Sequence, residues 1–167
     1  MKTLLILRHA KSSWDNPNLT DHDRPLKDRG KRDAPRMGDL IRQRDLVPEL
    51  IVSSTAKRAC QTAELVADAC AYEEDLIATR FFYPGDVEDY IEVLQRIPGD
   101  YGHDYERVMV VGHNPGLESL LYHLTGEWER MPTAALAEVR LPLTSWAELT
   151  MLTEGELVNL WEPKALP

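Results

Sequence analysis

Residues 1–14 read MKTLLILRHAKSSW, and the apolar run inside them ends abruptly on two polar side chains. Lys2 to Leu7 predicts a buried strand, because a strand covered on both faces shows a nearly continuous apolar run rather than an alternating one. Such a strand does not normally end on groups that are costly to bury, yet Arg8 and His9 follow directly. Either the strand simply reaches the surface at Arg8, or its end presents a working imidazole beside a fixed positive charge.

The size and composition are those of an ordinary globular protein. The chain has 167 residues, 43% of them hydrophobic and 28% charged, which predicts one domain over residues 1–167. The net charge of -9 argues against a nucleic-acid partner. No apolar run is long enough to span a membrane or to act as a signal peptide. Cys60 and Cys70 lie about 15 Å apart along one predicted helix, beyond disulfide reach, so we expect a reduced, cytoplasmic protein.

The rest of the chain alternates between helical and extended patterns. Helical spacing of apolar residues predicts helices over Gly30–Arg44, Ala56–Ala71, Val87–Arg96 and from Pro115 to Leu124. Short apolar runs predict strands over Leu50–Val52, Arg107–Val111, Ala134–Leu141 and Leu149–Trp161. This alternation indicates the α/β class, as a three-layer sandwich with a mainly parallel central sheet and helices on both faces.

Ligands of such sheets bind at the carboxyl ends of the strands. Three polar segments should therefore meet at one edge of the sheet, because each follows a predicted strand. They are Arg8–His9, Ser53–Arg58 and Gly112–His113.

The same three segments resemble the signatures of a known family. ILRHA (residues 6–10), SSTAKRACQT (53–62) and VVGHNPG (110–116) occur in the order typical of the histidine phosphatase (phosphoglycerate mutase-like) superfamily. The small size and the segment DHDRPL (21–26) are similar to the SixA-type phosphohistidine phosphatase branch. The resemblance covers nearly the whole chain. It implies a phosphatase that works without a cofactor or metal on a phosphorylated protein or a small phosphate ester.

Phosphoryl transfer needs a nucleophile, donors around three equatorial oxygens and a proton for the leaving group. His9 can attack as a neutral imidazole and form a phospho-imidazole that water then hydrolyses. Arg8 and Arg58 are planar forks that match phosphate oxygens, and His113 adds a donor at a helix start. We expect three further residues to contact the substrate: Arg24, which the SixA-type resemblance implies, Ser12 and Asn114.

The proton donor has more than one candidate. Many members of the superfamily carry an acid after the second helix, where this chain has Asp86, Glu88 and Asp89. The SixA-type resemblance instead implies an aspartate three residues before the loop arginine, which is Asp21. We favour Asp21 and keep Asp86 and Glu88 as alternatives. A phosphohistidine substrate needs less acid assistance, because imidazole leaves more easily than an alkoxide.

One residue departs from the superfamily pattern. Ala10 stands where the motif usually has glycine, so this position must adopt an ordinary backbone conformation. Arg-His-Ala also occurs in SixA-type relatives, so the alanine favours this branch of the superfamily and does not argue against the activity.

Each residue also has a plainer interpretation. Arg8 could be a solvated strand end, Arg58 could pair with Glu64, and His113 could merely cap a helix. His22 could hydrogen-bond within its acidic loop, and we take His103 and His123 as ordinary residues.

Three classes of function therefore remain. The favoured one is a phosphatase that acts through a covalent phosphohistidine, on protein phosphohistidine or, alternatively, on a small phosphate ester; a mutase would need a longer lid. A metallohydrolase using His9, His22, His113 and the aspartates is weaker, because the two arginines would repel a cation and no HxH or HExxH motif is present. The third is a non-catalytic phosphoprotein-binding module. The sequence leaves the oligomeric state open.

Overall fold

The computed structural model describes all of residues 1–167 and is built on a six-stranded sheet with the order β3-β2-β4-β1-β5-β6. Its strands are β1 (Lys2–Arg8), β2 (Leu50–Ser54), β3 (Leu76–Thr79), β4 (Arg107–Gly112), β5 (Leu136–Leu141) and β6 (Glu156–Trp161). β1 to β4 pair in parallel, whereas β5 is antiparallel to both of its neighbours. The expectation of a mainly parallel sheet is confirmed.

The continuous apolar run of β1 is explained by burial on both faces of the sheet. Leu4 and Ile6 belong to one hydrophobic cluster, Leu5 and Leu7 belong to the other, and all four are fully buried. Successive side chains of a strand point to opposite faces, so a central strand between two helical layers must be apolar at every position.

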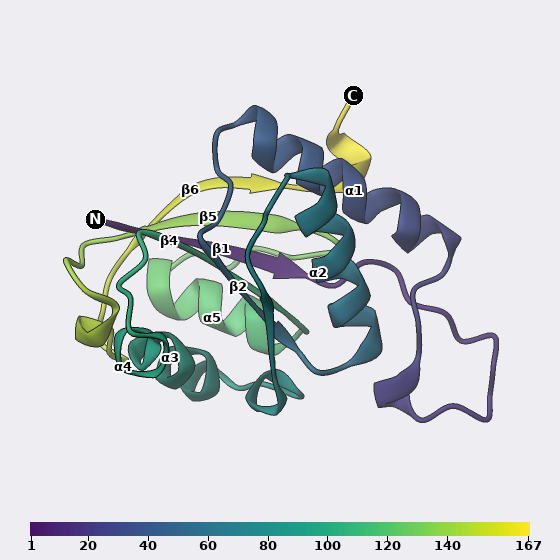
Figure 1. Ribbon diagram of the computed structural model, residues 1–167, viewed down its shortest axis with the longest axis horizontal. Helices are drawn as coiled ribbons and strands as arrows, with labels where there is room; N and C mark the ends of the chain where they lie inside the picture. Colours follow the sequence, from purple (N-terminus) through teal and green to yellow (C-terminus); the bar gives the residue numbers. More distant parts are fainter.

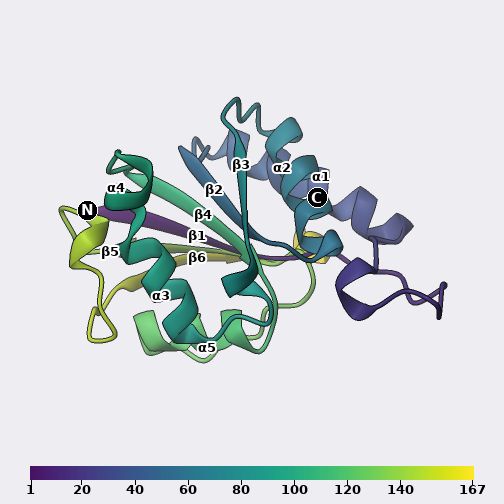
Figure 2. The same cartoon turned by 60° about the horizontal axis from the view of Figure 1, so that its bottom comes forward.

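Helices cover both faces of the sheet (Figures 1 and 2). One face carries α1 (Asp28–Gln43) and α2 (Lys57–Ala69), and the other carries α3 (Val87–Gln95), α4 (Ile97–Tyr101) and α5 (Gly116–Thr125). The three-layer α/β architecture expected from the sequence is therefore confirmed. No helix combines the length and the apolar character that crossing a bilayer would require.

The last predicted strand was placed too early. It begins at Glu156 rather than Leu149, because residues 150–153 form a turn in which the Thr153 N–H donates to the Thr150 carbonyl at 3.1 Å. The preceding 3-10 turn, Trp146–Glu148, carries an indole that is fully buried and donates to the Tyr105 carbonyl at 2.6 Å. Apolar residues in this region therefore cover the end of the core instead of extending the strand.

Two short elements were missed by the sequence analysis. β3 has four residues at a partly exposed edge of the sheet, and α4 has five residues directly after α3. Neither element is long enough to produce a periodic pattern.

The carboxyl ends of β1, β2 and β4 meet at one edge of the sheet, on the right in Figure 1. Arg8 is in register with Gly112, and Ser53 with Val111, so the three polar segments lie together as expected. α1 begins beside them, because Gly30 lies directly on the Lys11 backbone, where a side chain would not fit.

Candidate active site

His9 extends the line of β1 into the edge of the sheet. Its backbone N–H donates to the Gly112 carbonyl at 3.1 Å, and the residue is only 7% exposed. Its ring Nδ1 lies 2.8 Å from the Ala10 carbonyl oxygen. Since a carbonyl can only accept, Nδ1 carries the proton and Nε2 keeps a free lone pair. Burial, opposed by this hydrogen bond and reinforced by nearby cationic groups, lowers the pKa of His9 to about 3. His9 is thus a neutral imidazole with its nucleophilic nitrogen defined.

The turn after His9 is held by α2. The Ala10 N–H donates to Thr62 Oγ1 at 2.9 Å, and the Thr62 hydroxyl donates to the Arg58 carbonyl at 2.7 Å. Ala10 is fully buried and has no positive φ, as its side chain requires. Thr62 therefore couples the position of the imidazole to the helix that carries Arg58.

Arg8 lies beside His9 and is only partly satisfied. One terminal nitrogen, Nη1, donates to the Met131 carbonyl at 3.1 Å, whereas the buried Nε has no partner. Asn114 reaches the same carbonyl with Nδ2 at 2.8 Å, and its buried Oδ1 is also without a partner. Both side chains therefore keep hydrogen-bonding capacity inside the protein.

Arg58 projects from the first turn of α2 and contacts Asp21. Its Nη1 donates to the Asp21 carbonyl at 2.7 Å, and its Nη2 donates to Asp21 Oδ2 at 3.0 Å. The alternative pairing with Glu64 is not found. Arg58 is 7% exposed, so its charge is concentrated in this buried corner.

His113 follows β4 and faces the same corner as His9. The two ring centroids are 5.1 Å apart, and His113 Nε2 lies 2.8 Å from Ser54 Oγ at the end of β2. Burial, together with the nearby Arg58, lowers the pKa of His113 to about 4. The ring is therefore neutral, and its buried Nδ1 has no partner in the protein.

The Asp21 carboxylate accepts hydrogen bonds from three side chains, and the sequence did not predict these contacts. Tyr83 donates its hydroxyl to Oδ2 at 2.7 Å, Arg58 donates to the same oxygen, and Arg24 donates to Oδ1 at 3.2 Å. The Tyr83 hydrogen bond is the largest cause that lowers the pKa of Asp21, followed by the Arg58 and Arg24 charges. Asp21 is therefore an ionised carboxylate on donors that could equally hold a phosphoryl group.

Arg24 is fixed by neighbours from its own loop. It donates to the hydroxyl of Ser12 through Nη2 and to the Ser13 carbonyl through Nε at 3.3 Å. Its guanidinium carbon also lies 3.4 Å from the centre of the exposed Trp14 ring, which is a cation–π contact. Ser12 and Arg24 thus lie together on the rim of the site, next to Asp21.

The other acid candidates lie away from this cluster. Asp86 and Asp89 cap α3 reciprocally, and Asp86 and Glu88 are exposed. Neither Asp86 nor Glu88 hydrogen-bonds to His9, Arg8, Arg58 or His113, and both line a separate hollow beside Pro115 and His123.

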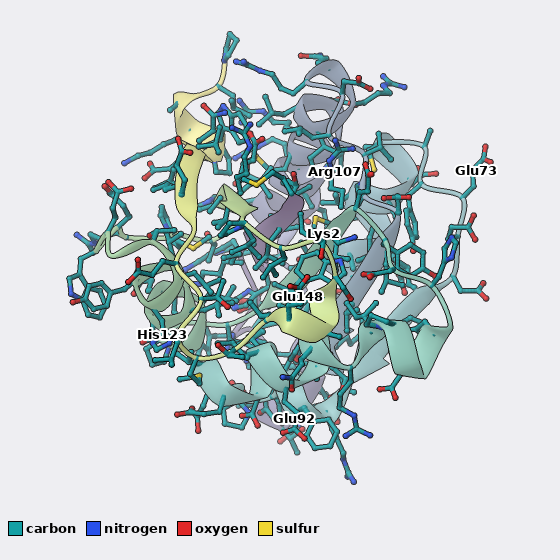
Figure 3. All side chains as sticks on the ribbon, turned by 90° about the vertical axis from the view of Figure 1, so that its left-hand side faces the viewer. Lys2, Glu73, Glu92, Arg107, His123 and Glu148 are labelled. Atoms are coloured by element: carbon teal, nitrogen blue, oxygen red, sulfur yellow. The ribbon has the colours of Figure 1, made fainter.

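The remaining histidines divide between the rim and the distant surface. His22 Nε2 bonds to Thr55 Oγ1 at 2.9 Å, and its ring meets the Tyr83 ring edge-on. Its Nδ1 lies 3.5 Å from the Asp23 carboxylate of its own acidic loop. His123, which Figure 3 labels, lies on α5 and contacts the Met151 carbonyl, and the His103 ring meets the Tyr105 ring edge-on.

Three functional candidates were missed by the sequence analysis: Tyr83, Ser54 as the partner of His113, and Thr62. Ser54 and Thr62 both lie within SSTAKRACQT, where polar residues flank Arg58. Tyr83 follows two aromatic residues and carries no such signal. No group of three or more His, Cys, Asp or Glu side chains is arranged to hold a metal ion.

Comparisons with known proteins agree with this geometry. The model of the histidine phosphatase superfamily (branch 1) matches residues 4–81. An uncharacterized chloroplastic protein of Arabidopsis thaliana is 33% identical over 91% of this chain and 72% of its own length. An uncharacterized protein of Mycobacterium tuberculosis is 34% identical over 86% of this chain and 91% of its own.

Solved structures share the fold over nearly the whole chain. A structure from Agrobacterium tumefaciens, assigned as a phosphohistidine phosphatase SixA, superimposes with a TM-score of 0.81 at 28% identity, covering 97% of this chain and 98% of the other. The protein histidine phosphatase SixA complexed with tungstate also gives 0.81, at 24% identity and 97% coverage of both chains, a likeness of fold alone. Sequence similarity to a phosphoglycerate mutase of Cutibacterium acnes covers only 40% of this chain and 28% of the mutase.

Proposed function

The chain belongs to the histidine phosphatase superfamily, in its SixA-type branch, and is therefore a phosphatase; we propose that it removes phosphate from protein phosphohistidine through a covalent intermediate on His9. The observation that carries this proposal is the tautomer of His9. The Ala10 carbonyl holds the proton on Nδ1, and burial keeps the ring neutral, so Nε2 is a ready nucleophile.

In the first step, His9 Nε2 attacks phosphorus, a nitrogen–phosphorus bond forms, and the bond to the leaving group breaks. Arg8, Arg58 and His113 surround the imidazole with donors, and Arg8 Nε is still free to donate. His113 Nδ1 can donate as well when the Ser54 hydroxyl donates to Nε2, because a neutral imidazole then carries its proton on Nδ1. Fixed donors stabilise the charge on the transferring oxygens without reorganisation. In the second step, water attacks the phosphorus, inorganic phosphate leaves, and His9 returns to its neutral state.

Asp21 would serve as the proton-handling group. Its carboxylate is ionised because Tyr83, Arg58 and Arg24 stabilise the charge. A bound phosphoryl group would draw the arginines toward itself and place a second negative charge beside Asp21, and both changes raise a carboxyl pKa. Asp21 could then take up a proton for the leaving group, or deprotonate the attacking water.

The ionised resting state of Asp21 favours a substrate that needs little acid. When the ring of phosphohistidine is already protonated on its other nitrogen, breaking the nitrogen–phosphorus bond releases neutral imidazole. An alkoxide leaving group must instead receive a proton during the reaction. This difference supports phosphohistidine over a phosphate monoester.

A substrate screen tests the proposal. Phosphohistidine on a carrier protein, phosphoglycerates and sugar phosphates should be compared side by side by the release of inorganic phosphate. We expect the highest kcat/KM with phosphohistidine. A higher kcat/KM with any small ester would make the chain a small-molecule phosphatase of the same superfamily, and absence of turnover on every substrate would favour a binding module.

We also propose that turnover needs no metal ion. EDTA should leave the rate unchanged, while vanadate or tungstate should compete with substrate for the arginine donors. Loss of activity on chelation, restored by a divalent ion, would favour the metallohydrolase instead.

A further inference from the structure

A basic groove leads away from the candidate active site on an otherwise acidic protein. Two adjacent hollows of about 480 and 500 Å3 share Pro132, Glu162 and Lys164 as lining residues. Their basic lining side chains are Arg8, Arg29, Arg32, Arg36, Arg130 and Lys164. Three carboxylates, those of Asp33, Glu118 and Glu162, line them as well. The groove is thus basic, whereas the whole chain has a net charge of -9.

The groove begins at the candidate active site itself. Arg8 and Asn114 line its inner hollow, and both keep a buried polar atom without a partner. The outer hollow lies between the first half of α1 and the last residues of the chain, which are neighbours in Figure 1. The Arg36 side chain joins the two segments by donating to the Leu166 carbonyl at 3.2 Å.

The arginines of the groove form one face of α1. Arg29, Arg32 and Arg36 are spaced three and four residues apart, so they project on the same side of the helix. Asp33, buried to 9% exposure, lies 3.6–3.9 Å from all three guanidinium groups. One carboxylate at these distances neutralises only part of three charges, so the arginines keep free donors.

This placement is unfavourable for α1 itself. Like charges four residues apart repel, and cations in the first turns of a helix oppose its dipole. Arg29 and Arg32 lie within the first five residues of the helix and are 54% and 68% exposed. A purely structural helix would gain from acidic residues at these positions, so the basic face is explained better by a ligand than by folding.

We propose that this groove binds an acidic segment of the phosphorylated protein substrate, next to the phosphohistidine; this inference rests on the proposed function. The cations are spread over two hollows, which suits several carboxylates on an extended chain better than one compact phosphate. The basic groove would also attract an acidic substrate protein, which the net charge of -9 would otherwise repel.

A matched pair of charge reversals tests the groove. Arg32 and Arg42 lie on the same helix, are 68% and 60% exposed, and are each 3.9 Å from one aspartate, but only Arg32 lines the groove. The substrates are two phosphohistidine peptides with the same length, one with Asp and Glu flanks and one with neutral flanks. The readout is the ratio of kcat/KM for the acidic peptide to that for the neutral peptide.

We expect the native protein to prefer the acidic peptide and the preference to shrink with added salt. Arg32→Glu should reduce the ratio about threefold to tenfold, the scale of an exposed charge pair that becomes repulsive, and Arg42→Glu should not. A native ratio near one, or an equal reduction in both variants, would overturn the proposal.

A binding measurement separates this inference from the proposed function. A fluorescently labelled acidic peptide without phosphate is titrated with native protein and with Arg32→Glu, and anisotropy is followed. Weaker binding to the variant would support the groove even if no phosphohistidine substrate were turned over. Equal binding to both proteins, or tighter binding of a single-stranded DNA oligonucleotide than of the peptide, would contradict it.

Discussion

The two ends of the parallel strands differ in how many of their buried polar atoms have hydrogen-bond partners. At the amino ends, where Figure 3 labels Lys2 and Arg107, the Lys2 side chain is buried. Its Nζ lies 3.2 Å from the Asp104 carbonyl and 3.4 Å from the Asp104 carboxylate. Arg107, at the start of β4, donates through Nη1 to the Val47 carbonyl at 3.1 Å, although its Nε has no partner. At the carboxyl ends, the Arg8 guanidinium and the His113 imidazole each keep a buried nitrogen without a partner.

The distribution of unpartnered atoms shows what this difference means. Arg8 Nε, His113 Nδ1 and Asn114 Oδ1 lie at the carboxyl edge, and only Arg107 Nε lies at the amino edge. Each buried polar atom without a hydrogen bond costs about 1–3 kcal/mol of folding free energy. The unpartnered polar atoms thus concentrate at the carboxyl edge, where they offer a ligand both donors and an acceptor.

The largest effect should come from His9, the residue that ends β1. His9→Gln removes the nucleophile but keeps a polar side chain of similar size, so turnover of every substrate should fall by more than about 10⁴-fold. The measurement is kcat with phosphohistidine and with phenyl phosphate, and a thermal melt verifies folding. Residual activity within about tenfold of the native rate would contradict the assignment.

Arg8 and Arg58 should come next, and they allow the two edges to be compared directly. Arg58→Ala and Arg8→Ala should each lower kcat by about 10²–10³-fold, because a fixed donor to the transferring phosphoryl group is lost. A rise in KM alone would limit both residues to ground-state binding.

Lys2→Met is the matched change at the amino edge. It leaves Asp104 without its cation and should lower the free energy of unfolding by roughly 1–3 kcal/mol, with kcat unchanged. Urea denaturation and steady-state kinetics check the two effects. A large loss of kcat in Lys2→Met would contradict the claim that only the carboxyl edge of the sheet takes part in catalysis.

Asp21 should show an effect that depends on the substrate. Asp21→Asn keeps the shape but removes the titrating group, so hydrolysis of a phosphate monoester should slow by about 10²-fold. With phosphohistidine the loss should be much smaller, because the leaving imidazole needs less acid. Glu88→Gln is the control, and a substrate-dependent loss there rather than in Asp21→Asn would move the acid to the other loop.

The last prediction concerns stability and its dependence on pH rather than the rate of turnover. The pKa values of His9 and His113 are lowered to about 3 and about 4, whereas an unfolded histidine titrates near 6.5. Between these values the unfolded chain binds more protons than the folded one, so stability should fall as the pH drops below about 6.5. By pH 4.5 the loss should be on the order of a few kcal/mol. Urea denaturation at several pH values measures it, and His113→Gln should show a shallower dependence; an identical dependence would mean that His113 is not the source.

Much of the fold and the core of the candidate site could be predicted from short patterns. The apolar run before Arg8 requires a central strand, and polar residues after three parallel strands must share an edge. Those two rules were enough to bring His9, Arg58 and His113 together. The resemblance to the SixA-type branch added Asp21 and Arg24, which come from a loop that no periodic pattern could place.

The parts that escaped prediction depend on packing between distant segments. Tyr83 reaches Asp21 across 62 residues of sequence, and its loop has no pattern that points to the site. The apolar residues after Leu149 predict a longer last strand, but residues 150–153 form a turn and β6 begins only at Glu156. The basic groove also escaped notice, since Arg32 and Lys164 meet only in the folded chain.

The central claim is that the neutral His9 accepts the phosphoryl group, and trapping that intermediate tests it most directly. Native protein is mixed with ³²P-labelled substrate, quenched within the first turnover, and analysed by peptide mapping. The account predicts one labelled residue, His9, with a phosphate that is labile in acid and stable in base, and no label in His9→Gln. A label on another residue, or turnover of native protein with no labelled intermediate and direct attack of water on the substrate, would contradict it.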